Sequence, residues 1–323
     1  MTALDRGARA GFVLASLDRG LLCPSNLGYA TPMETVAEQS EVRVEAAALT
    51  DIGHTRDSNE DAYLIATLQR SMHVHDASPV ARGWFQGEAV GTLLVVADGM
   101  GGQGGGSLAS STAVHAVADY LLNVMPWAKI SVADLRSRVS QTGLRAQLSS
   151  ALVMTDKSVK TTAAQSSTPR MGTTLTVALV LWPALYVAHV GDTRCYLLQS
   201  GRLRRLTTDH NLAQRFVDES PEAVEPPAHF QNILWNALGG TSGLPKPEVH
   251  KVVLEPNARI LLCSDGLNKH VSDERIDRVL RGSESCAARC AMLVEQANAG
   301  GGTDNVTVVV AQAHPNKAPD TKE

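Results

Sequence analysis

The sequence predicts an α+β fold built on antiparallel sheets. Apolar runs of strand length come in clusters, and the helical patterns are grouped between these clusters instead of alternating with single strands. Within one cluster, residues 173–207, the connections are so short that we expect each to join antiparallel neighbours. A doubly wound parallel sheet would need a helix-length crossover between successive strands. These observations favour antiparallel sheets with packed helices.

The composition is typical of a globular protein and argues against several classes of function. The chain has 323 residues, of which 44% are hydrophobic and 19% are charged, and its formal net charge is -4. It shows no basic field or charge block, so we expect neither a nucleic-acid partner nor membrane binding. Five scattered cysteines without CxxC spacing favour free thiols in a reducing compartment, and no signal peptide is evident. We therefore expect a cytoplasmic protein.

The hydrophobic pattern divides the chain into an extension, a domain and a tail. Residues 1–42 show little periodicity and are expected to form a partly ordered N-terminal extension. Alternating apolar runs begin at residue 43, so the predicted domain spans residues 43–314. Residues 315–323 are predicted to be a polar C-terminal tail.

In the first half of the domain, two segments have helical spacing and one has repeated strand spacing. Residues 107–125, "SLASSTAVHAVADYLLNVM", and residues 131–160 are the predicted helices. Residues 173–207 are predicted to form a meander of four strands. The polar stretch 68–88, which contains His73 and His75, is expected to be a solvated loop.

In the second half, a proline-punctuated segment separates two groups of elements. Residues 209–249 are expected to form short helices and loops that act as a flap. Strand patterns return within residues 250–267, and helices are predicted over residues 272–282 and 285–300. Residues 304–313, "DNVTVVVAQA", are predicted to close the domain as a strand.

Five acidic residues lie at the ends of predicted strands. Asp98 and Asp265 follow apolar runs and precede a glycine, whereas Glu60, Asp61 and Asp304 precede apolar runs. A single Asp-Gly pair is most often a turn signal. However, Mg²⁺ and Mn²⁺ select carboxylate oxygens, and a two-metal centre needs several of them. The recurrence at strand ends therefore favours a shared metal site.

The glycine-rich stretch 95–106, "VVADGMGGQGGG", also fits the G-x-G-x-x-G spacing of a dinucleotide-binding loop. That interpretation fails on charge, because Asp98 would place a carboxylate beside the bound pyrophosphate. Asp119 has the spacing of the ribose-binding acid but lies inside a predicted helix. No Lys-Ser or Lys-Thr follows the glycines, which excludes a P-loop.

Eight motifs resemble, in their order, those of the metal-dependent type 2C (PPM) protein serine/threonine phosphatases, and most of all the compact bacterial branch. They are "RDSNED", "VVADGMGG", "MGTTLTVALV", "HVGDTRCYLL", "LTTDHNLAQ", "NALGG", "LLCSDGL" and "GGTDNVTVVV". The similarity runs from about residue 43 to residue 312. It implies a four-layer α/β-β/α sandwich, in which two antiparallel sheets are flanked by helices, with a binuclear Mn²⁺ or Mg²⁺ centre at one end.

The resemblance also implies roles for the matched residues. Asp98 would bridge the two metal ions, and Gly99 would ligate one of them through its carbonyl oxygen. Asp265 and Asp304 would complete one of the two metal positions. These assignments come from the family and not from spacing alone.

The remaining implied residues concern the second metal position and the substrate. Glu60 and Asp61 would hold the other ion directly or through water, and Arg56 would bind the substrate phosphate with its planar guanidinium. The implied reaction is hydrolysis of protein phosphoserine and phosphothreonine by a hydroxide that bridges the two ions. The implied partners are phosphorylated proteins and a serine/threonine kinase that the enzyme opposes in bacterial signalling. We expect a monomer.

Four positions depart from the family pattern. Met100 stands where eukaryotic members carry a histidine proposed as a general acid, and Gln103 and Ser107 replace a usual His and Glu. Pro169 replaces an aspartate that holds a third metal in bacterial members, so binding of a third ion is left open, with Asp265 and water as its obvious ligands. A non-catalytic phosphoprotein-binding module is the alternative function, although the core ligand set is complete.

Several other residues of the family pattern are interpreted as structural. Asp192 and Asp209 are expected to hold turns through backbone N–H groups. Thr173 and Thr174 are expected to be strand residues beside the site, and Trp235 is expected to pack the flap.

Overall fold

The computed structural model describes residues 42–74, 83–102, 104–124, 138–219, 225–240 and 243–315. The predicted extension, apart from residue 42, and the predicted tail from residue 316 onward lie outside these ranges. All strand pairs of the described residues are antiparallel, and they form two sheets. In the same ranges no helix has both the length and the apolar character of a membrane span.

The first sheet has the strand order β1-β12-β11-β7-β8. Its strands are β1 (Val42–Asp51), β12 (Val306–Pro315), β11 (Arg259–Cys263), β7 (Arg194–Gln199) and β8 (Arg202–Arg205). The first and last strands of the domain are neighbours in this sheet, and their pairing runs without a break from Val42 opposite Pro315 to Asp51 opposite Val306.

The second sheet has the order β10-β6-β5-β3-β4-β9, and β2 pairs with β3 alongside this path. Its strands are β10 (Glu248–Val253), β6 (Ala184–Val190), β5 (Leu175–Leu181), β3 (Gly83–Met100), β4 (Gly172–Thr173), β9 (Leu238–Gly239) and β2 (Asp61–Val74). Every residue of β5 and β6 is buried, because both faces of this sheet are covered.

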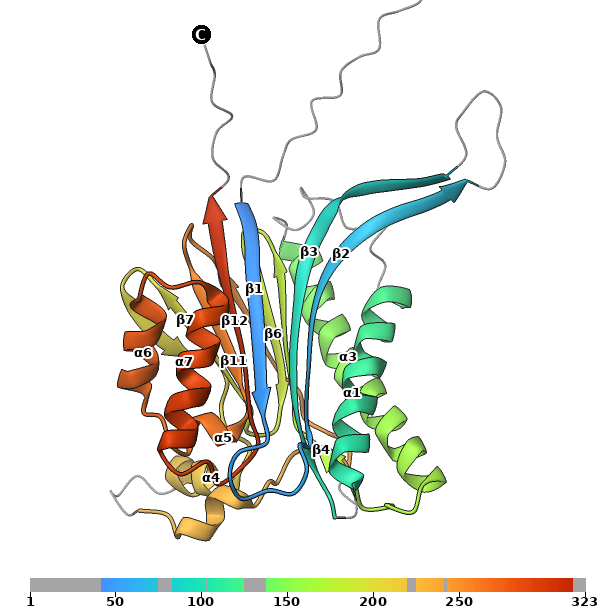
Figure 1. The fold of residues 1–323 in the computed structure, drawn as a ribbon. Helices are drawn as coiled ribbons and strands as arrows, with labels where there is room; N and C mark the ends of the chain where they lie inside the picture. Colours follow the sequence, from blue (N-terminus) through green and yellow to red (C-terminus); the bar gives the residue numbers. More distant parts are fainter. Residues whose placement is uncertain are drawn as a thin grey trace, which may run out of the picture. The chain divides into compact units, whose positions relative to one another are not determined.

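The helices form the two outer layers (Figure 1). α1 (Gly105–Asn123) and α3 (Arg138–Gln165) pack on the second sheet, and α6 (Asp273–Arg281) and α7 (Cys286–Ala299) pack on the first. Shorter helices are α4 (Leu212–Glu219), the 3₁₀ helix η2 (Ala228–Asn232) and α5 (Asp265–Asn268). The arrangement confirms the predicted α+β class and its four-layer α/β-β/α sandwich, and it confirms the predicted helix pairs on either side.

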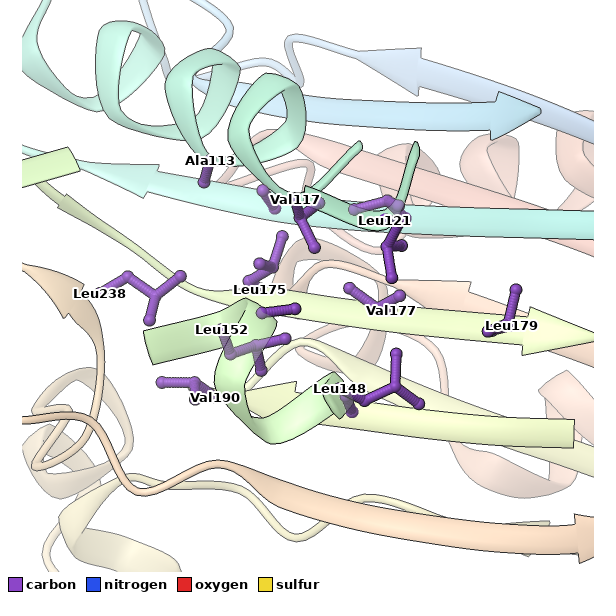
Figure 2. Packing of buried hydrophobic residues seen from close by; sticks show 14 of the residues in the cluster. Ala113, Val117, Leu121, Leu148, Leu152, Leu175, Val177, Leu179, Val190 and Leu238 are labelled. Carbon is purple, nitrogen blue, oxygen red and sulfur yellow. The ribbon is translucent and has the colours of Figure 1, made fainter. Parts of the chain in front are cut away.

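Alternation along β5 shows how one strand contributes to two cores. Leu175, Val177 and Leu179 face the helices and pack among α1 and α3, as Figure 2 shows. Ala178 and Val180, which alternate with them, belong to the separate cluster that fills the space between the two sheets. Successive side chains of a strand point to opposite faces, so a continuous apolar run is what a strand covered on both faces requires.

One connection of the predicted meander does not join neighbours. β5 pairs with β6 in the second sheet, whereas β7 pairs with β8 and β11 in the first. The short link 191–193 therefore carries the chain from one sheet to the other, and the prediction that it joins antiparallel neighbours is wrong. Gly191 makes the crossing possible: its φ is 112°, and a Cβ there would lie 2.5 Å from the Cβ of Thr174.

The predicted loop at 68–88 is also wrong in large part. β2 and β3 continue as a two-stranded ribbon in which His73 pairs opposite Trp84, and Figure 1 shows this ribbon curving away from the sheet. Register shifts near Gln69 mark the bend. Ladder hydrogen bonds satisfy the backbone whatever the side chains are, so a polar composition did not exclude strands here. His75 lies outside the described residues.

Candidate active site

A cleft of about 1010 Å³ lies at the end of the sandwich where strands of both sheets finish or begin. Six of the seven predicted site residues line it: Arg56, Glu60, Asp98, Gly99, Asp265 and Asp304. The seventh, Asp61, lies behind the wall of the cleft, where its side chain contacts that of Ser264. The structure therefore brings together residues that come from four separate segments of the chain.

β2 and β3 position two of the carboxylates. Asp61, the first residue of β2, pairs directly opposite Asp98 near the end of β3. The backbone of Asp98 is held on both sides: its N–H donates to the hydroxyl of Thr174 at 2.9 Å, and its carbonyl accepts from the hydroxyl of Thr173 at 2.9 Å. Both threonines therefore lie beside the site, where the sequence predicted them.

β11 and α5 position the third carboxylate. Asp265 is the first residue of α5, directly after the fully buried Ser264. The Ser264 hydroxyl donates to Asp61 Oδ2 at 2.7 Å and accepts from the Thr307 N–H at 2.9 Å. Asp61 Oδ1 and Asp265 Oδ1 are buried and have no hydrogen-bond partner within the described ranges. Buried carboxylate oxygens need a partner, and a divalent cation is one that this all-oxygen donor set fits.

Two basic side chains hold the fourth carboxylate. The Arg56 guanidinium forms a bidentate pair with Asp304, in which Nε lies 2.8 Å from Oδ1 and Nη2 donates to Oδ2 at 2.8 Å. Lys269 Nζ lies 2.8 Å from Asp304 Oδ2 and 2.6 Å from Asp265 Oδ2. The backbone N–H of Asn305 also donates to Asp304 Oδ1, at 2.9 Å. Both oxygens of Asp304 are therefore engaged.

Glycines at the end of β3 and at the start of α1 let the backbone pack against Glu60. A Cβ on Gly99 would lie 2.1 Å from the carbonyl oxygen of Gly106 and 2.6 Å from that of Glu60. A Cβ on Gly106, in the first turn of α1, would lie 2.5 Å from the Glu60 carboxylate. Glycine at these two positions therefore allows the backbone to approach the acidic site closely. Asp119, the residue with the spacing of a ribose-binding acid, is exposed on α1, which agrees with the rejection of a dinucleotide-binding loop.

Crowding of buried carboxylates shifts their pKa values. Burial and repulsion from neighbouring carboxylates raise the pKa of Asp61 to about 7, against the hydrogen bond from Ser264, and raise the pKa of Asp98 well above its usual range. Burial acts in the same direction on Asp304, but hydrogen bonds from its basic neighbours lower its pKa overall. The site concentrates negative charge, which divalent cations would offset.

Comparison with known proteins decides the family. The family model described as protein phosphatase 2C matches residues 68–298, which is more than half of the chain. This chain belongs to the protein phosphatase 2C family. The match confirms the family predicted from the eight motifs, and relatives from Listeria and Mycobacterium are named serine/threonine phosphatases.

Two relatives and one solved structure illustrate the similarity. Serine/threonine phosphatase stp of Listeria welshimeri is 31% identical over 232 residues, which cover 71% of this chain and 88% of that protein. Serine/threonine protein phosphatase PstP of Mycobacterium tuberculosis is 35% identical over 223 residues, covering 68% and 40% respectively. The crystal structure of a PstP catalytic domain in complex with two manganese ions has a TM-score of 0.64 and 31% identity, and covers 84% of this chain and 99% of that one.

Of two aspartates in the phosphatase 2C pattern that were interpreted as structural, one departs from that interpretation and the other keeps it with a different partner. Asp192, interpreted as a turn-holding residue, instead lines the cleft, where burial and repulsion from Asp265 raise its pKa to about 8. It faces the cleft because the crossing between the sheets places it there. Asp209 is structural as expected, but its partner is a guanidinium: Arg194 donates to it from Nε at 3.0 Å and from Nη2 at 2.6 Å.

Sequence reasoning missed two further residues of this phosphatase site. Asn305 holds the loop that carries Arg56, because its Nδ2 donates to the carbonyls of Ile52 and Ser58, both at 3.0 Å. Lys269 was missed although it lies four residues after Asp265, which is the spacing of a helical ion pair. That spacing is the signal that could have revealed it.

A second group of potential metal ligands joins His189 of β6 to two residues of the predicted flap, His210 and Glu248, with ligand atoms within 4.8 Å of one another. Its hydrogen bonds describe a polar network. His189 Nε2 lies 3.1 Å from the Thr208 carbonyl oxygen, which can only accept, so this nitrogen carries the proton. Glu248 accepts from both the N–H and the hydroxyl of Thr208. These ligand atoms are already used, so we assign the group a structural role.

The same network supports the flap. His210 Nδ1 accepts from the Gly191 N–H at 3.1 Å and lies 3.0 Å from the side-chain amide of Asn236. The Trp235 ring packs against His210 with a centroid distance of 5.0 Å, and its backbone N–H donates to the His210 carbonyl. Trp235 therefore packs the flap, as the sequence predicted.

Proposed function

We propose that this protein hydrolyses phosphoserine and phosphothreonine in proteins with two divalent cations, Mn²⁺ or Mg²⁺, held in the cleft. Asp98 would bridge the ions, the Gly99 carbonyl would ligate one of them, and Asp265 and Asp304 would complete that position. The carboxylates of residues 60 and 61 would hold the other ion, directly or through water.

One observation carries the proposal. Carboxylates from four separate segments converge at one cleft, and among the described residues the oxygens Asp61 Oδ1 and Asp265 Oδ1 are buried there without a hydrogen-bond partner. A structural role alone would leave these oxygens unsatisfied. Cation binding accounts for both their burial and their lack of donors.

The chain's own groups suit phosphate chemistry around such ions. Bound divalent ions supply an activated water as nucleophile and neutralise the charge that develops on the phosphoryl group. Arg56 is half exposed and lies at the cleft, so its fork can turn from Asp304 to two oxygens of a substrate phosphate. Thr173 and Thr174 keep Asp98 in place through its backbone.

The proposal is tested with purified protein, a phosphothreonine peptide and p-nitrophenyl phosphate. We expect hydrolysis only with added Mn²⁺ or Mg²⁺, and loss of at least about 100-fold in the Asp98→Ala and Asp265→Ala variants, the scale of a lost metal ligand or its support. Asp119→Ala, which removes an exposed carboxylate of α1, is the matched control. Full activity in excess EDTA would refute the proposal, and metal binding without turnover would favour the non-catalytic phosphoprotein-binding module.

The cellular setting is part of the same proposal. We propose that the enzyme opposes a serine/threonine kinase on phosphorylated protein substrates, acts as a monomer and works in the cytoplasm. Support for a reducing compartment comes from Cys195, Cys263, Cys286 and Cys290, which are all buried free thiols. Phosphoproteomics of a deletion strain would identify the substrates, and size-exclusion chromatography would test the monomer.

A further inference from the structure

We propose that Lys269 is a built-in cation that competes with a divalent ion for Asp265 and Asp304. This inference rests on the proposed metal roles of those two aspartates. It adds a residue that works against metal binding in one half of the centre. Its basis is that one ammonium group contacts both carboxylates, at 2.6 Å and 2.8 Å.

The position of Lys269 is set by the fold and not by a flexible approach from solvent. α5 begins at Asp265 and ends at Asn268, and the Lys269 N–H donates to the Asp265 carbonyl at 3.0 Å. A lysine four residues after an aspartate on a helical turn is directed back to it. The side chain of Lys269 is 25% exposed, which is much less than the 52% of Arg56. Lys269 is therefore a fixed part of the wall of the cleft.

The contacts of Asp304 show that a metal ion must compete with its basic partners. Its Oδ1 accepts from Arg56 and from the Asn305 N–H, and its Oδ2 accepts from Arg56 and Lys269. A carboxylate oxygen has two lone pairs, so both oxygens are fully used. A divalent ion can bind Asp304 only after a basic side chain has left it.

Asp265 has a different distribution of contacts. Its Oδ2 is held by Lys269, whereas its Oδ1 is buried and has no partner among the residues described. A cation can therefore reach Asp265 through Oδ1 while the lysine stays in place. The proposed metal position needs both Asp265 and Asp304, so competition with the ammonium group lowers the metal affinity of that position.

Two consequences follow for the protein without metal and with metal. In the metal-free protein, Lys269 offsets the repulsion between two neighbouring carboxylates and stabilises the fold. During metal loading, the ion must displace a basic side chain from Asp304 and must bind beside the ammonium charge of Lys269, so one Mn²⁺ binds more weakly than it would without the lysine. A charge-assisted hydrogen bond of this kind corresponds to a change of about tenfold in affinity.

The test is isothermal titration of metal-free protein with MnCl₂, comparing the wild type with Lys269→Met. Methionine keeps the length of the side chain and removes the charge. We expect the weaker Mn²⁺ site to tighten by about tenfold or more, with a lower melting temperature without metal and a larger rise on adding Mn²⁺. Lys157→Met, on the exposed surface of α3, is the control and should match the wild type. Lys269→Gln, which is neutral but can still donate hydrogen bonds, replaces the methionine variant if that variant fails to fold.

The outcomes separate this inference from the proposed function. Unchanged Mn²⁺ affinity in both Lys269 variants, while Asp265→Ala loses a site, would overturn the role of Lys269 and leave the metal centre standing. Absence of Mn²⁺ binding to the wild type would instead overturn the proposed centre. A raised KM for phosphopeptide with unchanged Mn²⁺ affinity would also overturn the inference, because it would make Lys269 a phosphate-binding residue.

Discussion

Replacing Ser264 by alanine removes a single hydroxyl group, yet it should lower the free energy of unfolding of the metal-free protein by several kcal/mol. The hydroxyl is fully buried and joins two groups, because it donates to Asp61 Oδ2 at 2.7 Å and accepts from the Thr307 N–H at 2.9 Å. Alanine leaves the amide unpaired, at a cost of about 1 to 3 kcal/mol, and removes a hydrogen bond to a charged group worth about 1.5 to 3 kcal/mol. Together these give roughly 2.5 to 6 kcal/mol. The loss falls on Oδ2 of Asp61, whose other side-chain oxygen, Oδ1, already lacks a hydrogen-bond partner within the described structure.

The assay is urea unfolding of metal-free protein at pH 8. This pH lies above the pKa of Asp61 in the wild type, which is raised to about 7, so the carboxylate that Ser264 contacts is mostly ionised in the reference protein. The control is Ser158→Ala on α3, where the hydroxyl makes one long contact of 3.3 Å, and its effect should stay within about 0.5 kcal/mol. A loss of less than about 1 kcal/mol in Ser264→Ala would refute the reasoning, because it would mean that neither partner needs the hydroxyl. In addition, the proposed role of Asp61 as a metal ligand predicts that Mn²⁺ affinity falls by about 10- to 100-fold when the serine that orients it is removed.

Two further predictions concern the buried polar groups. Arg194→Met should lower the free energy of unfolding by about 3 to 5 kcal/mol in urea, because it leaves the largely buried Asp209 carboxylate without its bidentate partner; a loss below about 1 kcal/mol would contradict this. Burial, with repulsion from His210, lowers the pKa of His189 to about 4, below the ordinary value of 6.5. The unfolded state then binds the proton more tightly, so the stability that wild type has over His189→Gln should decrease by about 2 kcal/mol between pH 7 and pH 5. Parallel stability curves for the two proteins would contradict this prediction, because they would mean that His189 binds its proton as tightly in the folded protein as in the unfolded chain.

The elements that the sequence predicted well are those whose pattern reflects burial. β5 and β6 read as unbroken apolar runs because helices cover one face and the other sheet covers the second. The carboxylates were recognisable for a related reason, since Asp98 and Asp265 each stand directly at the end of such a run. Acidic residues at the ends of apolar runs can therefore be recognised in a single sequence, and their convergence at one cleft is what the structure adds.

The features that were missed depend on partners that are distant in the sequence. Nothing local distinguishes the link 191–193 from a hairpin turn, because the choice between sheets is decided by pairing of β7 with β11. Asn305 acts on the carbonyls of residues 52 and 58, about 250 positions away, and a lone asparagine carries no trace of that role. Lys269 joins Asp265 to Asp304, and only the first of these is near it in sequence.

The pairing of the first and last strands has a consequence for engineering. Val42 and Pro315 are cross-strand partners, and their pair lies nine positions along the ladder from Asp51 and Val306, or about 30 Å. A linker that joins Pro315 to Val42 would have to cover only the spacing of two paired strands, about 5 Å. The domain is thus suited to circular permutation, with new ends opened at the exposed Ser200-Gly201 turn between β7 and β8. The order of the chain could be changed while the cleft, at the other end of β1 and β12, keeps every residue in place.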